Sequence, residues 1–362
     1  MPKDKVALGI LGFGSMGRNY LNVLTKEPLE NLEVTAVCDL KLPDEKQPGV
    51  EYFDDVDAFL TSGVCDAISI VTPHFSHTDF GIKALQAGLH VLVEKPISVH
   101  KADCERLLAA HTDKSQVFSA MFNLRMLDIY QKVKALLVSG ELGEIQRISW
   151  TITDWFRTQA YYDSGSWRGT WKGEGGGVLV NQCPHQLDLW QWLFGMPEQV
   201  FANVGLGRHH KIEVEDAVTA ILEYSNGCQG TFITSTGEAP GVDRLEIIGD
   251  KGLLIVGKDS IKFLKNSIPT SEAIRTVDRN SPAPEIEESE FTFSKPVPTH
   301  RKIFANFADA ILNGTPLVAP AEEGINSVEL ANAMLLSGLQ KRVVELPLAG
   351  SEFESEFKKL IC

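Results

Sequence analysis

The feature that most constrains the fold of this chain is a glycine-rich turn, Gly12-Phe13-Gly14-Ser15-Met16-Gly17. The apolar run before it, residues 6–11, is typical of a strand, and residues 15–25 have the apolar spacing of a helix. Glycine permits a tight turn at the first position, close approach of a phosphate at the second, and packing of helix on strand at the third. Free N–H groups at the start of the helix favour a pyrophosphate there. The motif therefore predicts a dinucleotide site.

An acidic residue lies where such a site requires one. Asp39 follows the apolar run 33–38, and a carboxylate at that place accepts hydrogen bonds from the adenosine ribose hydroxyls. The same carboxylate repels a 2′-phosphate, so the sequence favours NAD over NADP, although Lys41 nearby works against that preference. A glycine-rich turn followed by a solvated aspartate, with no ligand, is the alternative interpretation.

The first 121 residues alternate between short apolar runs and helical patterns. Apolar strands separated by helices are typical of a parallel sheet covered on both faces. We expect strands at 6–11, 33–38, 67–72, 90–94 and 117–121, and helices at 15–25, 55–61, 76–87 and 100–111.

Ligands of such sheets lie beyond the carboxyl ends of the strands, and two of these ends carry polar residues. The third strand is followed by Thr72-Pro73-His74 and His77, which we expect to line the cofactor. The fourth is followed by Glu94-Lys95-Pro96, where the proline rigidifies the turn and could carry a cis bond. The ammonium of Lys95 could stabilise the alkoxide that develops from a substrate hydroxyl, although its position suits a surface lysine equally well.

After about residue 122 the pattern changes to consecutive strands, so we divide the chain into domains 1–122 and 123–362. Asn226-Gly227 is a hairpin signal between two alternating runs, and several such runs in a row indicate an antiparallel sheet. His209 and His210 are interpreted as an exposed hairpin tip. We expect strands at 147–152, 216–225, 229–235, 243–249 and 342–347, and helices at 126–139, 299–313 and 321–340.

The segment 154–177 lacks periodicity, and its length is that of a functional loop. It is rich in aromatic residues and arginines. Aromatic faces pack against the apolar faces of sugar rings, and guanidinium groups donate to hydroxyls. A loop tied down by its own aromatics is the alternative, and both can hold. The candidates for substrate binding are Trp155, Arg157, Tyr162, Trp167 and Arg168.

Three glycines, 175–177, precede a segment 178–193 that is interpreted as a helix, and such a run lets something approach the backbone closely. Asn181, His185 and Asp188 are spaced by four and three residues, which would place them on one helix face. Histidine suits proton transfer near neutral pH, and Asp188 could orient the imidazole. From the residues alone, His185 could equally be a packed core or surface histidine.

These motifs in this order resemble the glucose–fructose oxidoreductase, inositol dehydrogenase and rhizopine-catabolism (Gfo/Idh/MocA) family. The resemblance covers nearly the full length and rests on GILGFGSMG, on VTPHFSHTDFGIKALQAGLHVLVEKPIS and on the GGG…H…D segment. It implies an α/β fold, with a Rossmann domain followed by an α/β domain that has a large open, mainly antiparallel sheet. One face of that sheet backs the active site and the other commonly makes subunit contacts. The catalytic lysine of the family falls on Lys95 and its catalytic histidine on His185.

The resemblance implies an NAD-dependent enzyme that oxidises a secondary alcohol of a sugar, inositol or glycoside, with His185 as acid and base and Lys95 stabilising the alkoxide. Asn123 and Arg125 lie at the domain junction, from which relatives often reach the substrate, or they cap the hinge. Many relatives carry aspartate where this chain has Asn181, which cannot accept a proton but can position a hydroxyl. Two alternatives stay open: tightly bound NAD recycled through a keto-sugar intermediate, as in glycosidic cleavage, and a non-catalytic regulator that senses NAD or a sugar.

The composition restricts the partners and the location. A formal net charge of −14 and a pI near 5.1 disfavour nucleic acid and anionic membranes as partners. No apolar stretch reaches the roughly 18 residues of a transmembrane helix, and the N-terminus has no secretory pattern. The six cysteines are scattered without metal-ligand spacing, as is typical of buried thiols in a reducing compartment. We expect a metal-free cytoplasmic protein and, from the resemblance, a dimer or tetramer formed through the C-terminal sheet.

Overall fold

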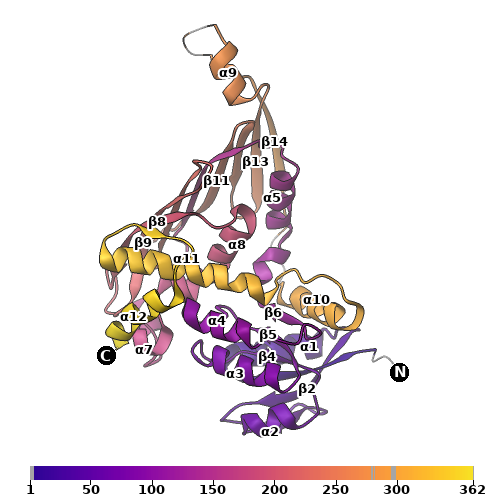
Figure 1. Ribbon diagram of the computed structural model, residues 1–362. Coiled ribbons are helices and arrows are strands. Elements are labelled where there is room, and N and C mark those ends of the chain that lie inside the picture. The colour runs from indigo at the N-terminus through magenta and orange to yellow at the C-terminus, as the bar shows by residue number, and fades with distance from the viewer. Residues whose placement is uncertain (1–3, 279, 281, 295–298, 362) are drawn as a thin grey trace. The chain divides into compact units, whose positions relative to one another are not determined.

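The computed structural model describes residues 4–278, 280, 282–294 and 299–361, which form two compact units (Figure 1). The first unit comprises Met1–Met126, Pro298–Glu329 and Ala349–Ser355. The second comprises Leu127–Val297, Leu330–Leu348 and Glu356–Cys362. The chain thus returns to the first unit twice, so the units are not two consecutive stretches. The division into domains 1–122 and 123–362 stays a prediction.

A six-stranded parallel sheet, in the order β3-β2-β1-β4-β5-β6, forms the centre of the first unit. The chain runs outward from β1 to β3 and then crosses back to β4. The strand order therefore reverses between β1 and β4, where sheets of this type bind ligands. The sequence did not predict the three-residue β3. The strands are β1 (Val6–Leu11), β2 (Leu32–Cys38), β3 (Glu51–Phe53), β4 (Ala67–Ile70), β5 (His90–Val93) and β6 (Phe118–Ala120).

Helices cover both faces of this sheet, which is why its strands are apolar without alternation. In β5, Val91 and Val93 belong to one buried apolar cluster, whereas Leu92 belongs to another on the opposite face. Phe304 and Phe307 of α10 complete the second cluster. The helices are α1 (Ser15–Lys26), α2 (Val56–Thr61), α3 (Ser76–Gln86), α4 (Lys101–Ala109), the 3-10 turn η1 (Asn123–Met126) and α10 (His300–Asn313).

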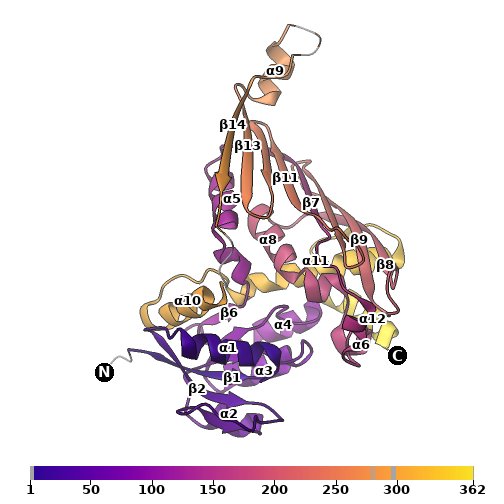
Figure 2. The same cartoon turned by 180° about the vertical axis from the view of Figure 1, so that it is seen from behind.

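A nine-stranded sheet, in the order β14-β13-β12-β11-β7-β10-β9-β8-β15, forms the second unit. The expected open, mainly antiparallel sheet is confirmed, with one parallel pair, β7 and β10. Figures 1 and 2 both show α9 (Thr270–Thr276) beyond the far ends of β13 and β14. The strands are β7 (Ile145–Ile152), β8 (Gln199–Leu206), β9 (Glu215–Glu223), β10 (Gln229–Ser235), β11 (Asp243–Gly249), β12 (Gly252–Val256), β13 (Ser260–Asn266), β14 (Ile286–Thr292) and β15 (Val344–Glu345).

One face of this sheet is packed and the other is open. Buried and exposed residues alternate along β9, where Leu222 is fully buried and Ile221 is 45% exposed. The packed face holds α5 (Asp128–Val138) and α8 (Pro184–Phe194), and the ring of Trp190 contacts Phe232 of β10. The second half of α11 (Ala321–Gln340) also belongs to this unit, where the hydroxyl of its Ser337 accepts a hydrogen bond from β8.

Two sequence-based expectations were wrong in part. The segment 154–177 is not a continuous loop, because it contains the short helices α6 (Gln159–Asp163) and α7 (Trp171–Glu174). The expected last strand is only the two residues of β15, and the chain continues into a helix that the sequence analysis missed, α12 (Gly350–Ile361). Phe353 and Phe357, four residues apart and both buried, were the available signal for α12.

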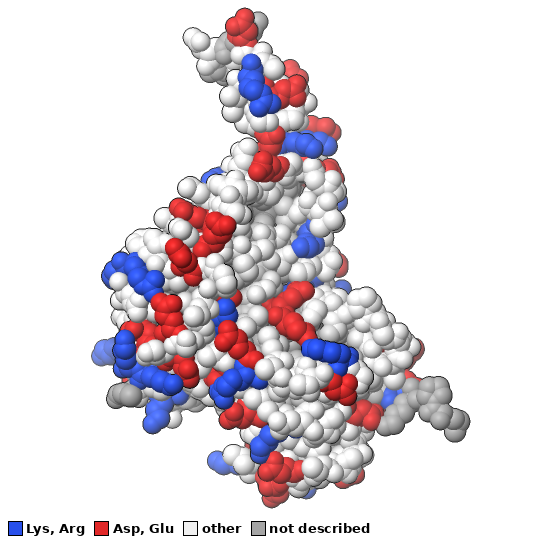
Figure 3. All heavy atoms as spheres, in the orientation of Figure 1, with Lys and Arg blue, Asp and Glu red and all other residues white. Residues whose placement is uncertain are grey.

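The surface and the cysteines agree with the composition. On the face seen in Figure 3, acidic and basic side chains are interspersed. Among the described residues, no helix has the length and hydropathy needed to cross a membrane. The expected burial of the thiols is confirmed for five of them, and Cys362 lies outside the described residues. The buried five are Cys38, Cys65, Cys104, Cys183 and Cys228.

Candidate active site

The glycine-rich turn between β1 and α1 separates structural from ligand-facing glycines. Gly12 has a φ of +101°, and a Cβ there would lie 2.7 Å from the main-chain oxygen of Val71. A Cβ at Gly17 would lie 2.1 Å from the oxygen of Gly12. At Gly14, in contrast, no heavy atom lies within 4 Å of the added Cβ. The first and third glycines are therefore needed by the fold itself, while the second leaves open space next to free helix N–H groups, as a pyrophosphate needs.

Asp39 is fixed beside this turn at the end of β2. One carboxylate oxygen accepts the N–H of Phe13 at 2.6 Å, and the other accepts the N–H of Lys41 at 2.9 Å. Each oxygen can accept a further hydrogen bond, so the carboxylate can also bind ribose hydroxyls. Together with the open space at Gly14, this arrangement fits an adenine dinucleotide. Of the other turn residues, Phe13 is buried, and Ser15 and Met16 are exposed.

Lys95 lies in a tightly held turn after β5. The Lys95–Pro96 peptide bond is cis, as the sequence analysis allowed. The neighbouring Glu94 is buried, accepts the main-chain N–H of Lys95 at 2.9 Å, and also accepts a hydrogen bond from the hydroxyl of Tyr20 on α1. Burial raises the pKa of Glu94, and the charge of Lys95 opposes that rise. The lysine side chain itself is half-buried.

His77, which we expected to contact the cofactor, has another position. Its ring is fully buried, with Nδ1 2.9 Å from the carbonyl oxygen of Pro96 and Nε2 2.7 Å from that of Thr72. Burial lowers the pKa of His77, and the two carbonyl groups oppose that effect. His77 therefore connects the turn after β4 to the turn that carries Lys95. Pro73 is exposed and His74 half-buried at the same edge of the sheet.

Arg125 does not suit the substrate contact that we expected of it. Its side chain is fully buried and forms an ion pair with Glu323, and it also donates to the carbonyl oxygen of Val318 at 3.0 Å. Asn123 is buried as well and donates to the hydroxyl of Thr299 at 3.0 Å. These bonds stabilise the junction after η1, which agrees with the alternative role of hinge capping. We therefore leave Arg125 out of the proposed site.

The three glycines 175–177 make room for the protein's own backbone. Gly175 ends α7 in the left-handed region, with a φ of +87°. A Cβ at Gly177 would lie 1.9 Å from the main-chain oxygen of Glu215, and one at Gly176 would lie 2.5 Å from Val180. The group that approaches this glycine run is thus the first residue of β9.

The segment after the glycines is not one α-helix, so the expectation for 178–193 was wrong in its first third. Residues Val178–Gln182 form a single π-helical turn, η2, and α8 begins only at Pro184. Asn181 therefore belongs to a different element from His185 and Asp188, and the common helix face does not exist. His185 is half-buried in the first turn of α8. Asp188 is buried and accepts a hydrogen bond from Gln191 at 3.0 Å.

Two buried carboxylates hold this π turn, and the sequence analysis missed both. Glu215 accepts the N–H groups of Gly177 and Leu179 at 2.8 and 3.0 Å. Glu174 accepts the N–H of Gly169 at 2.7 Å and a hydrogen bond from the Asn181 side chain. Burial raises the pKa of Glu215 to about 7 despite the hydrogen bonds it accepts. A helix interrupted by a π turn often marks a functional position.

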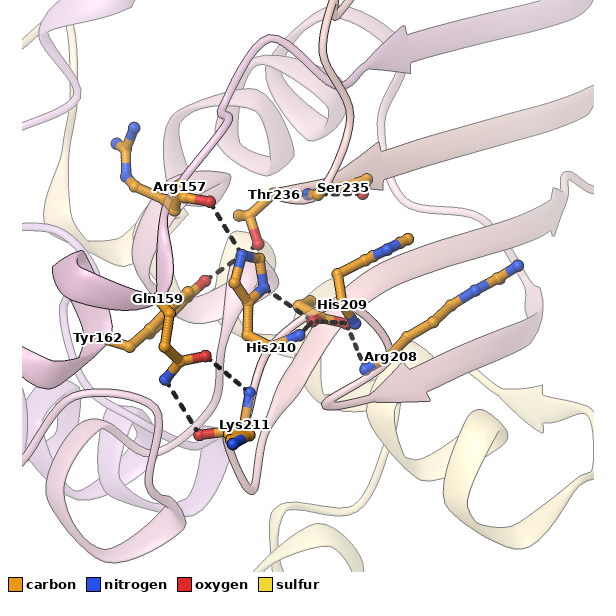
Figure 4. A network of polar contacts seen from close by, with 11 residues as sticks. Arg157, Gln159, Tyr162, Arg208, His209, His210, Lys211, Ser235 and Thr236 are labelled. Carbon is orange, nitrogen blue, oxygen red and sulfur yellow. Dashed lines mark hydrogen bonds and ion pairs between the residues drawn. The ribbon is translucent and has the colours of Figure 1, made fainter.

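His210 was interpreted from the sequence as exposed, but its side chain is only 7% exposed and is part of a network (Figure 4). Its Nδ1 lies 2.9 Å from the carboxylate of Asp216, and its Nε2 lies 2.9 Å from the main-chain oxygen of Arg157. Nearby, the buried Tyr162 shares a 3.0 Å hydrogen bond with the hydroxyl of Thr236. These bonds fix the start of the 154–177 segment to β9 and to Thr236, the residue that follows β10. Trp167 is exposed in that segment.

Two sequence models of one family match this chain, one for each part of the family architecture. The model described as an oxidoreductase family with an NAD-binding Rossmann fold matches residues 6–122. The model described as the GFO/IDH/MocA C-terminal domain matches residues 130–255. The chain belongs to the Gfo/Idh/MocA family. As a member of that family it is an oxidoreductase, and its first domain binds NAD.

Curated relatives of the family span nearly the whole chain. The NADP-dependent scyllo-inositol 2-dehydrogenase of Bacillus subtilis is 25% identical over 95% of this chain and 96% of its own length. The inositol 2-dehydrogenase of Rhizobium meliloti is 24% identical over 94% of this chain and 99% of its own. Both similarities therefore include both parts of the family architecture.

Solved structures of the family are similar over the same span. The WlbA dehydrogenase from Bordetella pertussis, solved with NADH and UDP-GlcNAcA, is 25% identical with a TM-score of 0.77. That likeness covers 95% of this chain and 100% of the other. Levoglucosan dehydrogenase, solved with NADH and L-sorbose, has a TM-score of 0.79 at 18% identity, covering 96% and 100% of the two chains. At that identity the likeness shows the fold alone.

The close approach at Gly177 predicts a loss of stability when a methyl group is added. We expect Gly177→Ala to lower the free energy of unfolding by about 1–3 kcal/mol, the usual cost of overpacking a buried position. Urea denaturation measures this difference. Gly257→Ala is the control, because the nearest atom to its Cβ is 3.9 Å away, and it should cost less than about 0.5 kcal/mol. Equal stability of the two variants would contradict the close approach.

The raised pKa of Glu215 predicts a pH dependence of stability. A carboxyl group whose pKa is raised by folding contributes most below its unfolded value of 4.5, and that contribution is lost as pH rises to about 7. We expect the free energy of unfolding of the wild type to fall relative to that of Glu215→Gln over this range, as measured by urea denaturation. The exposed Glu238→Gln should parallel the wild type. Parallel profiles for wild type and Glu215→Gln would show that the group does not titrate there.

Proposed function

We propose that this chain is an NAD-dependent dehydrogenase that oxidises a secondary alcohol of a sugar, cyclitol or glycoside. The observation that carries the proposal is the position of Lys95 in the first unit. It follows β5 at the carboxyl edge of the parallel sheet, the same edge as the open turn at Gly14. An ammonium group held at that edge suits the stabilisation of negative charge beside a bound dinucleotide.

Bound NAD would supply the hydride acceptor. The remaining steps are assigned to side chains of this chain: His185 accepts the proton of the substrate hydroxyl, and Lys95 stabilises the alkoxide oxygen. Asn181 cannot accept a proton, so a proton relay through this position is not part of the proposal. Its amide already donates to Glu174, which supports a role in fixing the π turn ahead of His185.

The choice of substrate class is supported by the relatives and by the 154–177 segment. Relatives that span the chain are named as inositol dehydrogenases, and similar structures were solved with sugar-type molecules. Trp155, Arg157, Trp167 and Arg168 offer the aromatic faces and donors that polyhydroxylated rings bind. We also expect the protein to be cytoplasmic, because its cysteines are scattered and its described cysteines are buried.

The open face of the second sheet supports association of the enzyme into a dimer or tetramer. Phe201 of β8 and Ile221 of β9 are 43% and 45% exposed on neighbouring strands. Burial of such side chains against a second copy is favourable. Sedimentation velocity of the wild type tests this assignment, and a monomer at micromolar concentration would contradict it.

The proposed acid–base role predicts the kinetics of two variants. His185→Ala should lower kcat by roughly 10²–10⁴-fold, because it removes the proton acceptor. Lys95→Ala should lower it by roughly 10²–10³-fold, because the alkoxide loses its counter-charge. Both are measured as NADH formation with a panel of sugars, inositols and glycosides. The exposed His209→Gln is the control and should keep its turnover.

If His185→Ala kept the turnover of the wild type across about pH 6–9, His185 would be excluded as the base. Turnover of the wild type without net NADH would instead support recycled cofactor, and binding of NAD and sugar without any turnover would support a sensor.

Asp39 predicts the cofactor preference. Replacing its carboxylate removes the charge that repels a 2′-phosphate, so Asp39→Ala should raise kcat/KM with NADP relative to that with NAD. We expect a change of at least roughly tenfold, about 1.4 kcal/mol of differential binding. Asp44→Ala, in the following loop, is the control for net charge. An unchanged ratio would show that Asp39 does not select the cofactor.

A further inference from the structure

Two arginines of the 154–177 segment stack on the same tyrosine. The guanidinium carbons of Arg157 and Arg168 lie 5.0 and 4.4 Å from the centroid of the Tyr161 ring. Their separation therefore cannot exceed the sum of these two distances. Arg168 also lies 4.3 Å from the centroid of Trp167 and donates to the Tyr161 hydroxyl at 2.7 Å. We call Arg157, Tyr161 and Arg168 the Arg–Tyr–Arg stack.

Neither guanidinium of the stack has a carboxylate partner among the described residues. The side chain of Arg157 donates to the main-chain oxygen of Phe156 at 3.1 Å, and that of Arg168 donates to Tyr161. Each guanidinium carries five N–H donors, so most of them remain available. Because the chain has 48 acidic and only 34 basic residues, two neighbouring arginines without a carboxylate partner are unexpected.

The nearby carboxylates form no ion pair with the stack in the described part of the chain, and their hydrogen bonds go to other groups. Asp216 accepts the main-chain N–H groups of Arg208, His209 and His210, in addition to the His210 ring. Glu213 accepts the N–H of Trp171, and Asp163 accepts the side chain of Gln159. The two guanidinium groups therefore keep N–H donors that an anionic group from outside the chain could bind.

Two buried N–H donors beside the stack also indicate that an acceptor from outside the chain binds there. Nε of Arg157 and Nε1 of Trp155 are buried and have no hydrogen-bond partner in the described part of the chain. The Arg157 guanidinium lies 5.9 Å from the centroid of the Trp155 ring, so both donors belong to one place. A buried N–H without an acceptor is costly, and a ligand oxygen would remove that cost.

The stack is also held in position. The main-chain N–H of Arg157 donates to Thr236 at 2.9 Å, and its carbonyl oxygen lies 2.9 Å from His210 Nε2. Figure 4 shows the Arg157 guanidinium directed away from this network. A hollow of about 530 Å³ opens beside Arg168, and its wall also carries Lys211 and the carboxylates of Asp163 and Glu213. A fixed pair of guanidinium groups with adjacent space suits recognition of an anion.

We propose that the Arg–Tyr–Arg stack binds an anionic group of the substrate, so that the preferred substrate is a sugar acid or sugar phosphate. This inference rests on the proposed function. The chemistry shared by the two ligands is a cluster of charged oxygens, which a guanidinium binds by parallel N–H bonds.

The test compares ligands that differ only in the anionic group. Glucose, glucuronate and glucose 6-phosphate share one ring, and the galactose series provides a second set. Calorimetry with the NAD-loaded protein measures binding without turnover, and initial rates give kcat and KM where turnover occurs. We expect at least one anionic ligand to bind at least tenfold more tightly than its neutral partner. Added salt should reduce that preference. Whether glucuronate or glucose 6-phosphate binds more tightly shows whether the site prefers a carboxylate or a phosphate.

Variants of the two arginines test whether the preference for anionic ligands depends on the stack. Arg168→Gln and Arg157→Gln should each weaken binding of the anion by roughly 10–100-fold, the range for hydrogen bonds to charged groups, and leave the neutral sugar within about threefold. Arg168→Lys should recover part of the loss. Arg208→Gln is the matched control, because its exposed side chain points away from Arg157 in Figure 4. Thermal melting confirms folding, and either glutamine variant suffices if the other does not fold.

The outcomes separate this inference from the proposed function. Equal binding of anionic and neutral ligands, or an equal loss in Arg208→Gln, overturns the anion site, while oxidation of a neutral sugar would leave the dehydrogenase assignment intact. Anion binding that depends on both arginines, with no ring oxidised, supports the anion site and contradicts the dehydrogenase assignment.

Discussion

The two main-chain N–H groups that donate to the buried carboxylate of Glu215 are the interaction on which the second unit's site depends. They tie the π turn to the first residue of β9, and the close approach requires the glycine run. The next residue, Asp216, is also fully buried and points to the opposite side of the strand, where it holds residues 208–210. One strand end therefore fixes both the turn before His185 and, through His210, the backbone of Arg157.

In the first unit, a buried histidine holds the turn that carries Lys95. The ring of His77 contacts carbonyl oxygens in two turns, so the turn that carries Lys95 cannot move independently of the turn after β4. Glu94 adds a hydrogen bond to the main chain of Lys95 and is itself held by Tyr20 on α1. The side chains proposed to be catalytic in the two units thus follow turns that are held by buried polar groups with main-chain hydrogen bonds. Such groups leave the surface of the turn available to ligands.

Local patterns were sufficient to predict the parallel sheet, the glycine-rich turn and the positions of Asp39 and Lys95, because each depends on residues close in sequence. The π turn, the ion pair of Arg125 with Glu323 and the burial of His210 depend on partners far along the chain. The spacing of Asn181 and His185 suits an α-helix, although Pro184 in the first turn of α8 was a local signal for a later start. The contact of Glu215 with the π turn could not be predicted from nearby residues. The role of the triple glycine could not be read without knowing which strand approaches it.

We propose that Lys95 and His185 act on one substrate oxygen, and a double-mutant cycle tests this most directly. The kcat/KM of Lys95→Ala, His185→Ala and the double variant would be measured with the same substrate and NAD. Residues that serve one transition state are strongly non-additive, so the double variant should lose little more than the more damaging single variant. Losses that multiply independently would contradict the account.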